Sequence, residues 1–344
     1  MERLTERQNR ILALVVRNYT ETAQPVGSKL LVEHYRLDMS SATVRNEMLE
    51  LTEKGYLRQP HTSAGRVPTE KGYRYFVRQL MVQTDLPSAT QRMIVHQFHQ
   101  AKDDIEEWMR LAVSVLAHQS QAAALVTAPH PHQVLFKHLS LIGTSGRQVL
   151  MVIVLMGGEV RQQLLFLPEP VSQDRLSVTA ERMTVQCEGL NADAIASIPD
   201  NFDNLEQDIL RLTVEEMRRS SLGGEIYRDG LANILAEPEF SETDAARRAL
   251  RILEERPLLE DLLTRAVVSP KIGGVQVLIG GEGAWDELRE CSIVLTRYGS
   301  PNILTGILGV LGPTRMPYGQ TISTVRFVAG VLSDLVSDMY GIGA

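Results

Sequence analysis

The sequence predicts an α+β protein, because strand-like and helical segments occur in separate runs rather than in strict alternation. Three apolar runs between residues 138 and 166 are broken by the segments GTSG and GG, which is typical of adjacent antiparallel strands. Charged helical patterns follow at 203–219 and 242–265. Three further apolar runs, at 274–280, 291–298 and 303–311, then precede an amphipathic pattern at 321–340. A sheet interrupted by a helical insertion would explain this order.

Composition narrows the class of protein. The chain has 344 residues, of which 44% are hydrophobic and 22% charged, as expected for two or three globular domains. The longest strongly apolar run, 149–156, is too short to span a bilayer, and the first residues lack an apolar signal core. The only cysteines, Cys187 and Cys291, are not in a CxxC motif. We therefore expect a cytoplasmic protein without disulfides or membrane contacts.

Charge is distributed unevenly along the chain. The net charge is −7, which by itself argues against a polyanionic partner. Residues 1–84, however, carry 13 Lys or Arg and nine Asp or Glu, a net charge of +4, so the remainder carries −11. A basic N-terminal part on an acidic body is expected when one domain binds nucleic acid.

The first 84 residues contain the order of elements found in a winged helix-turn-helix. Ser28 is expected to cap the second helix and Ser40 or Ser41 the third, which Gly55 would end. In chain order, we expect helices at 5–20, 28–35 and 41–54, a strand pair at 56–59 and 66–67, and a helix at 68–80.

The helix over residues 41–54 is the candidate recognition helix. Val44, Met48 and Leu51 share one face, and the acidic residues toward its C-terminal end would repel phosphates. Only the first two turns are therefore suited to approach DNA. Asn46 can pair with adenine, and Arg45 with guanine or a phosphate. The polar side chains of Ser40, Ser41 and Thr43 complete this candidate site. In the alternative interpretation, the serines only cap the helix and Arg45 is solvated.

The predicted hairpin is the candidate wing. Its small-residue tip would let the backbone approach a sugar-phosphate strand, and its candidate DNA-binding residues are Arg58, His61, Thr62, Ser63 and Arg66. The next helix carries Lys71, Arg74 and Arg78 at helical spacing. These three residues either extend the phosphate-binding surface or form an ordinary solvated face.

The segment GRVPTEKG looks at first like a nucleotide-binding loop. A phosphate loop requires Gly before the Lys and Ser or Thr after it, whereas Glu70 precedes Lys71 and Gly72 follows. Histidines such as His96 and His99 lack the spacing of a metal motif. No nucleophile, base and acid occur together, so we predict neither an enzyme nor a cofactor.

Two long N-terminal segments, LTERQNRILALVVRNYTETAQPVGSKLL and SSATVRNEMLELTEKGYLRQPHTSAGRVPTEKGYRYFV, carry a resemblance to a known family. A weaker resemblance to the same family is carried by two C-terminal segments, GGVQVLIGGEG and ILGVLGPTRMPYGQTISTVRFVAGVLSDL. The chain resembles the heat-inducible transcription repressor HrcA family of bacteria over nearly its whole length. Around 195–270 the resemblance is mainly one of position and length.

The resemblance implies three kinds of domain. A winged helix-turn-helix would span 1–84, and a GAF-like domain would span 89–195 and 271–344. A mainly helical dimerisation domain would be inserted at 196–270. It further implies a homodimer that binds an inverted-repeat operator, CIRCE, upstream of groE and dnaK chaperone operons. The GroE chaperonin would keep the repressor competent, and heat stress would relieve repression.

Two other hypotheses stay open. The chain is alternatively a metabolite-responsive winged-helix regulator that uses the GAF-like domain as its sensor. According to the second hypothesis, the chain is an interaction scaffold whose winged helix binds protein. The basic N-terminal part favours DNA over the scaffold.

Overall fold

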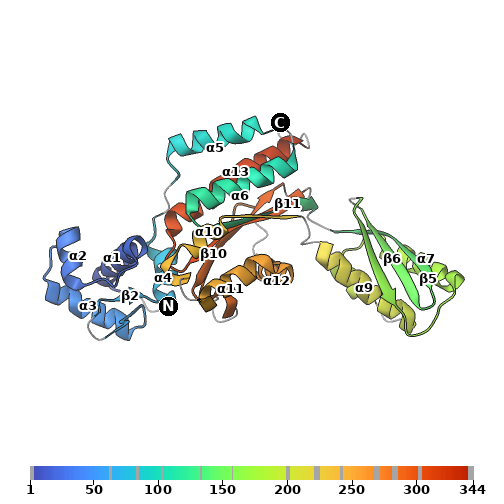
Figure 1. Cartoon of the computed structure of the whole chain (residues 1–344), viewed down its shortest axis with the longest axis horizontal. Helices are drawn as coiled ribbons and strands as arrows, with labels where there is room; N and C mark the ends of the chain where they lie inside the picture. Colours follow the sequence, from blue (N-terminus) through green and yellow to red (C-terminus); the bar gives the residue numbers. More distant parts are fainter. Residues whose placement is uncertain are drawn as a thin grey trace. The chain divides into compact units, whose positions relative to one another are not determined.

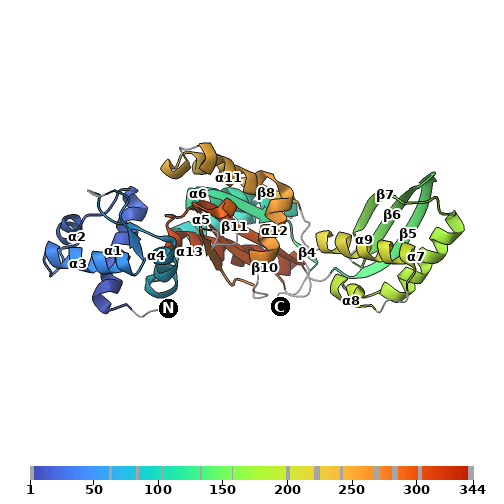
Figure 2. The same ribbon diagram turned by 90° about the horizontal axis from the view of Figure 1, so that it is seen from below.

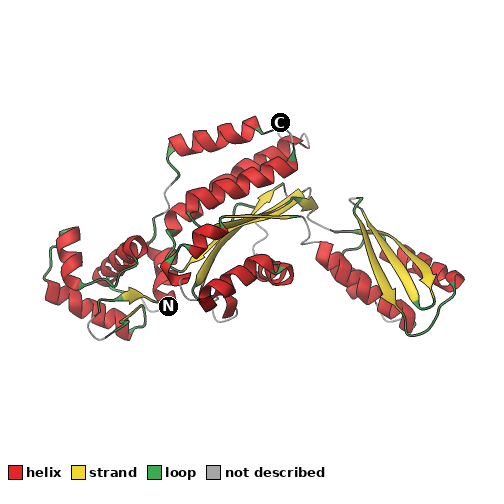
Figure 3. Cartoon of the chain, viewed as in Figure 1, coloured by secondary structure: helices red, strands yellow, loops and turns green. Residues whose placement is uncertain are grey.

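The computed structural model describes residues 4–61, 64–82, 85–101, 104–131, 134–156, 158–198, 202–220, 225–240, 243–266, 272–280, 286–300 and 304–339. The chain divides into two compact units. The larger comprises residues 1–128, 226–299 and 306–344, and the smaller comprises residues 129–225 and 300–305. Helices and strands both contribute extensively (Figure 3), which confirms the α+β class.

The larger unit begins with what we call the N-terminal module, residues 4–82. Its first three helices pack on one another, because α3 contacts both α1 and α2. A two-stranded antiparallel hairpin follows, with Leu57 opposite Pro68 and Arg58 opposite Val67. The module consists of α1 (Glu6–Thr22), α2 (Ser28–Tyr35), α3 (Ser41–Glu53), β1 (Leu57–Arg58), β2 (Val67–Pro68), α4 (Glu70–Tyr75) and the π-helical turn η1 (Phe76–Leu80).

Side-chain caps mark the starts of α1 and α4 in this module. Thr5 and Gln8 form a capping box at the start of α1, and Thr69 accepts a hydrogen bond from the Gly72 amide at the start of α4. Gly55, with φ of 76°, follows α3 as predicted. The expected cap at Ser28 is wrong, because Gly27 occupies the N-cap position of α2 and Ser28 is its first helical residue.

The rest of the larger unit is the central domain, built on an antiparallel sheet with the strand order β8-β3-β11-β10-β9. Strand β3 pairs with both β11 and β8, so residues about 100 positions apart lie side by side. The strands are β3 (Ala123–Thr127), β8 (Ile226–Asp229), β9 (Gln276–Ile279), β10 (Cys291–Gly299) and β11 (Leu304–Pro313). The first two residues of β11 belong to the smaller unit, where they pair with the short β4 (His130–Pro131).

Helices cover both faces of this sheet (Figure 1). One face carries α6 (Ile105–Ser120) and α13 (Tyr318–Met339), with α5 (Ser88–Gln100) packed against α6. On this side the buried Tyr298 hydroxyl donates to the Thr127 carbonyl over 2.6 Å. The other face packs an apolar core against α10 (Leu231–Leu235), η2 (Pro238–Phe240), α11 (Thr243–Glu254), α12 (Arg256–Ala266) and η4 (Asp286–Leu288).

The smaller unit has its own three-stranded sheet (Figure 2). It also has its own apolar core. Its strands form an antiparallel meander, in which Ile153 pairs with Leu139 on one side and with Arg161 on the other. Helix α7 packs on β5, and both α7 and α9 contribute to the core. The elements are β5 (Phe136–Ser145), β6 (Gln148–Leu155), β7 (Val160–Phe166), α7 (Gln173–Cys187), α8 (Ala192–Ala196) and α9 (Asn204–Ser220).

The insertion lies at other residues than expected. The prediction placed a mainly helical insertion at 196–270, whereas the smaller compact unit spans 129–225 and contains a sheet. The strands between 136 and 166 pair only with one another within the described residues. Conversely, α11 and α12 pack on the central sheet, because their apolar faces join the core formed by Ile293, Leu295 and Leu311. The insertion therefore begins earlier and is α+β rather than mainly helical.

Neither a membrane-spanning helix nor a metal-binding cluster is present among the described residues. No helix there is both long and apolar enough to cross a membrane. Within the same residues, no group of three or more His, Cys, Asp or Glu side chains is arranged to hold a metal ion.

Candidate nucleic-acid interface

The start of α3 presents small polar side chains to solvent. Ser40 occupies the N-cap position, and its hydroxyl accepts a hydrogen bond from the Thr43 amide over 3.1 Å and lies 2.9 Å from the Thr43 hydroxyl. Ser41, Arg45 and Asn46 are exposed in the first two turns. The polar N-terminal half of the helix is thus free to meet a ligand.

The opposite face of α3 is buried, as the helical spacing predicted. Val44 and Leu51 are fully buried and Met48 is 3% exposed, where α3 packs on α1 and α2. This burial orients the helix, because rotating it would expose three apolar side chains. Because the apolar face of α3 is fixed against α1 and α2, its polar face is turned toward solvent, as predicted.

Acidic side chains of α3 are tied to α1. Glu47 forms an ion pair with Arg7 at 3.3 Å, and Glu50 accepts a hydrogen bond from Gln8 Nε2 over 2.7 Å. Lys54 Nζ in turn donates to Gln8 Oε1 over 3.2 Å. These contacts hold the carboxylates toward the C-terminal part of the helix, away from its polar start.

The hairpin tip combines exposed side chains with a tight turn. Arg58 and His61 are exposed. The Ala64 amide donates to the His61 carbonyl over 2.9 Å, and Gln59 Nε2 donates to the Ala64 carbonyl over 3.0 Å. Two further predicted contact residues, Thr62 and Ser63, lie outside the described residues.

Arg66 connects three parts of the module. Its backbone amide and carbonyl exchange hydrogen bonds of 2.8 and 2.9 Å with Val26, in the connection between α1 and α2. Its Nε donates to Thr52 Oγ1 over 3.1 Å, near the end of α3. The half-buried guanidinium therefore has a structural contact in addition to its predicted role toward phosphate.

Gly65 is required by the fold of the module itself. A Cβ at this position would lie 2.4 Å from the Val26 carbonyl oxygen, a distance that no real side chain tolerates. We expected the small tip to permit close approach to a sugar-phosphate strand. The close approach seen at Gly65 is to the chain's own backbone.

The cations of α4 have partners within the chain. Lys71 Nζ donates to the Lys54 carbonyl over 2.7 Å and lies 4.5 Å from the centre of the Tyr56 ring. Arg74 Nη1 donates to the Ile279 carbonyl of β9 over 3.2 Å. These contacts favour a structural role for both residues, while Arg78 is exposed.

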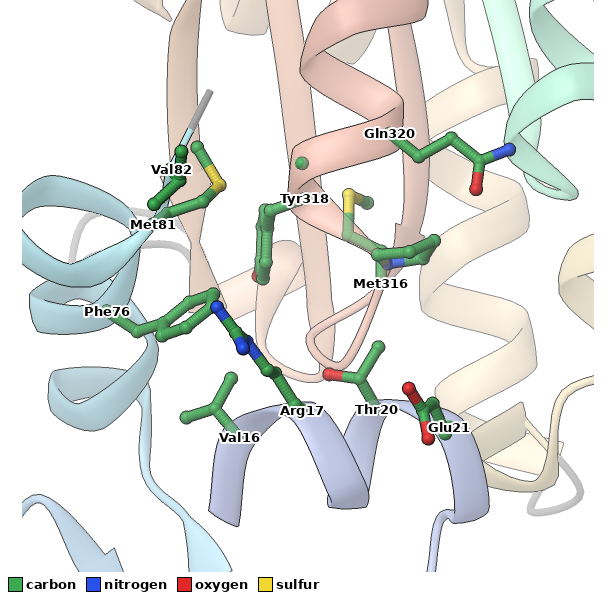
Figure 4. Close-up of a pocket in the computed structure, with 12 residues that line it drawn as sticks. Val16, Arg17, Thr20, Glu21, Phe76, Met81, Val82, Met316, Tyr318 and Gln320 are labelled. Atoms are coloured by element: carbon green, nitrogen blue, oxygen red, sulfur yellow. The ribbon is translucent and has the colours of Figure 1, made fainter. Parts of the chain in front are cut away.

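A pocket of about 240 Å³ lies where the N-terminal module meets the central domain. Figure 4 shows Arg17 extending from α1 toward Phe76 of η1, with Met316 and Tyr318 from the central domain nearby. No sequence pattern predicted a site here, because the lining residues come from segments as far apart as Val16 and Gln320 and share no local pattern. Only the fold brings these segments together.

The comparisons with known proteins first establish a class. Three relatives bear the name heat-inducible transcription repressor HrcA. They come from Roseiflexus castenholzii, Herpetosiphon aurantiacus and Thermomicrobium roseum, with identities of 46, 43 and 41%. Each comparison covers 98% of this chain, and 96, 97 and 97% of the respective relative. The class is therefore that of transcription repressors, which are regulators rather than enzymes.

The family follows from the same comparisons. Residues 106–322 match the model of the HrcA protein C terminal domain. The chain belongs to the HrcA family. A solved structure of a hypothetical protein, determined at 2.2 Å resolution, has a similar fold, with a TM-score of 0.60 at 22% identity over 98% of this chain and 99% of the other.

Proposed function

We propose that this chain is a heat-inducible transcription repressor that binds an inverted-repeat CIRCE operator upstream of chaperone operons as a homodimer. The N-terminal module is its winged helix-turn-helix, with α3 as the recognition helix and the β1–β2 hairpin as the wing. The central domain is its GAF-like domain. The observation that carries the proposal is the exposed polar start of α3, held beside a hairpin with exposed Arg58 and His61.

The electrostatics of α3 favour binding by its N-terminal half. The amide groups and the helix dipole make this end weakly positive, and Arg45 adds a full charge there. Asn46 offers the paired donor and acceptor that match adenine, while Ser41 and Thr43 suit phosphates or bases. Recognition helices usually contact base edges with this same end.

Dimerisation is supported by the outer face of the three-stranded sheet. The strand registers place one set of alternate residues on this face, opposite the buried core, and seven of them are apolar. They are Ile142, Leu150, Val152, Val154, Val160, Leu164 and Phe166, all half-buried or exposed. An apolar surface of this kind marks a protein interface. We assign it to a second copy of this chain, since a palindromic operator requires a two-fold symmetric reader.

Regulation by the GroE chaperonin rests on folding equilibria. A change of one or two kcal/mol in stability alters the folded fraction several-fold, so a marginally stable repressor would depend on chaperonin capacity. On heat stress, unfolded clients would occupy the chaperonin, and the operator would be released.

The metabolite-sensor alternative receives less support. A sensor needs an accessible cavity in its ligand domain. The sheet face toward α11 and α12 is instead filled by buried side chains, including Phe240, Leu253, Leu259 and Leu263. We therefore retain the operator-binding repressor as the proposed function.

The test is a gel-shift titration of the full-length chain on a chaperone-operon promoter fragment, with and without chaperonin. We expect specific binding that unlabelled operator competes away, and a larger active fraction when chaperonin is present. Failure to bind under both conditions would contradict the proposal. If the chain binds the operator equally well with and without chaperonin, operator binding would be supported and regulation by chaperonin would be contradicted.

Arg66 gives a separate prediction for the wing. Replacing Arg66 with Ala is expected to weaken binding to all sequences alike and to reduce the slope of log affinity against log salt concentration by about one unit. Thr52→Val is the matched control, because it removes the partner of Arg66 Nε but keeps the charge. A salt slope that is the same in Arg66→Ala and the unmodified chain would exclude a phosphate contact.

A further inference from the structure

Arg315 joins the central domain to the N-terminal module. It lies in the short connection between β11 and α13, and its side chain is only 14% exposed. Its Nη1 donates to the Thr20 carbonyl of α1 over 3.2 Å. Nε donates to Glu239 Oε1 over 2.6 Å, and Nη2 pairs with Glu237. One planar guanidinium thus bridges α1 and two carboxylates of the central domain.

The contact with Arg315 lies at the C-terminal end of α1. Thr20 lies in the last turn of this helix, where carbonyl groups lack amide partners within the helix. That turn contains no basic residue of its own, although a cation is favoured at a helix C-terminus. Arg315 supplies a hydrogen-bond donor to one of these carbonyls from a residue 295 positions away.

A second contact joins α4 to the central domain. Arg74 Nη1 donates to the Ile279 carbonyl at the end of β9. Gly280 follows, and a Cβ there would lie 2.1 Å from the Glu70 carboxyl carbon, so the two segments approach closely. The module is therefore held on the central domain at two places, through α1 and through α4.

Buried polar atoms surround these contacts. The Tyr73 hydroxyl and Glu239 Oε2 are both buried, and neither has a hydrogen-bond partner among the described residues. Burial, together with neighbouring Tyr318, Tyr19 and Glu239, raises the pKa of Tyr73 well above its ordinary value, and Arg315 opposes this. The junction thus combines apolar packing, including the Tyr73 and Tyr318 rings 6.0 Å apart, with the hydrogen bonds and ion pairs of Arg315.

We propose that Arg315 is a positioning residue, which fixes the orientation of the N-terminal module and thereby sets the operator half-site spacing that the dimer accepts. This inference rests on the proposed function. Because α3 packs on α1, a fixed α1 also fixes the recognition helix. A dimer gains affinity from its second half-site only when the connection holds both recognition helices at the required separation.

The test compares equilibrium affinities for three kinds of DNA: the promoter inverted repeat, the same repeat with a lengthened or shortened spacer, and a single half-site. Arg315→Ala is expected to lower affinity for the inverted repeat about tenfold and to flatten the dependence on spacer length. Half-site affinity should stay within about twofold, because the module is unchanged. Arg247→Ala, which removes an exposed arginine of α11, is the matched control.

Arg74→Ala provides a second variant in case Arg315→Ala does not fold, and it should change the spacer dependence in the same direction. Wild-type spacer dependence in every folded variant would overturn the inference. Equal losses on half-site and inverted repeat would also overturn it, because they indicate damage to the module. If the unmodified chain binds none of the three DNAs, the proposed function itself fails, and this inference fails with it.

Discussion

Replacing Arg45 and Asn46 together with alanine is expected to abolish the preference for the inverted repeat, while dimerisation and thermal stability stay unchanged. Both side chains are exposed in the first two turns of α3, so their removal leaves the packing intact. A well-placed contact to a base contributes about 1–3 kcal/mol of discrimination. Loss of both should reduce the ratio of specific to non-specific affinity at least about thirtyfold.

The measurement is competition binding of operator and scrambled duplex at one salt concentration, since electrostatic affinity changes with salt. Arg110→Ala is the matched control, because it removes one exposed arginine from α6, outside the module. Its specificity ratio should equal that of the unmodified chain. If the double variant still selects the palindrome, α3 is not the recognition helix.

The elements of the N-terminal module were predictable because their signals are local. The helix expected over 41–54 is α3, and Ser40 caps it through Thr43, three residues away. Its buried face follows from helical periodicity alone. The contact residues proposed on its other face stay predictions.

The division into units was not predictable in the same way. Strand β3 pairs with β8 across about 100 residues, and periodicity carries no information on such partners. The strands over 136–166 were correctly expected to be adjacent and antiparallel. That they form a separate sheet depends on α7 and α9, which cover that sheet instead of the central one.

The long motif TSAGRVPTEKGYR contains more than a surface for DNA. Gly65 fits against Val26, and a Cβ on Gly72 would lie 2.2 Å from the Tyr56 carbonyl oxygen. The Thr69 hydroxyl donates to the Gly55 carbonyl over 2.7 Å. Much of the motif therefore holds the hairpin and α4 against the rest of the module. Residue types alone could not separate these contacts from contacts with phosphate.

Charge placed in the centre of the apolar sheet face is expected to convert the proposed dimer into monomers. Val152 on β6 and Leu164 on β7 lie on the outer face and pair diagonally through neighbouring register positions. Replacing both with Glu would bury two unpaired carboxylates in the interface, which costs several kcal/mol. The outward orientation of both side chains means that the fold of the smaller unit should survive.

Light scattering after size exclusion measures this change directly, and operator affinity should fall at least about a hundredfold, because the second half-site no longer binds within the same complex. Val178→Glu is the matched control, since Val178 is an apolar residue, 56% exposed, on α7. It should remain dimeric and bind the operator normally. A double variant that is still dimeric at micromolar concentration would assign dimerisation to another surface. A monomer that retains full operator affinity would separate dimerisation from recognition of the palindrome.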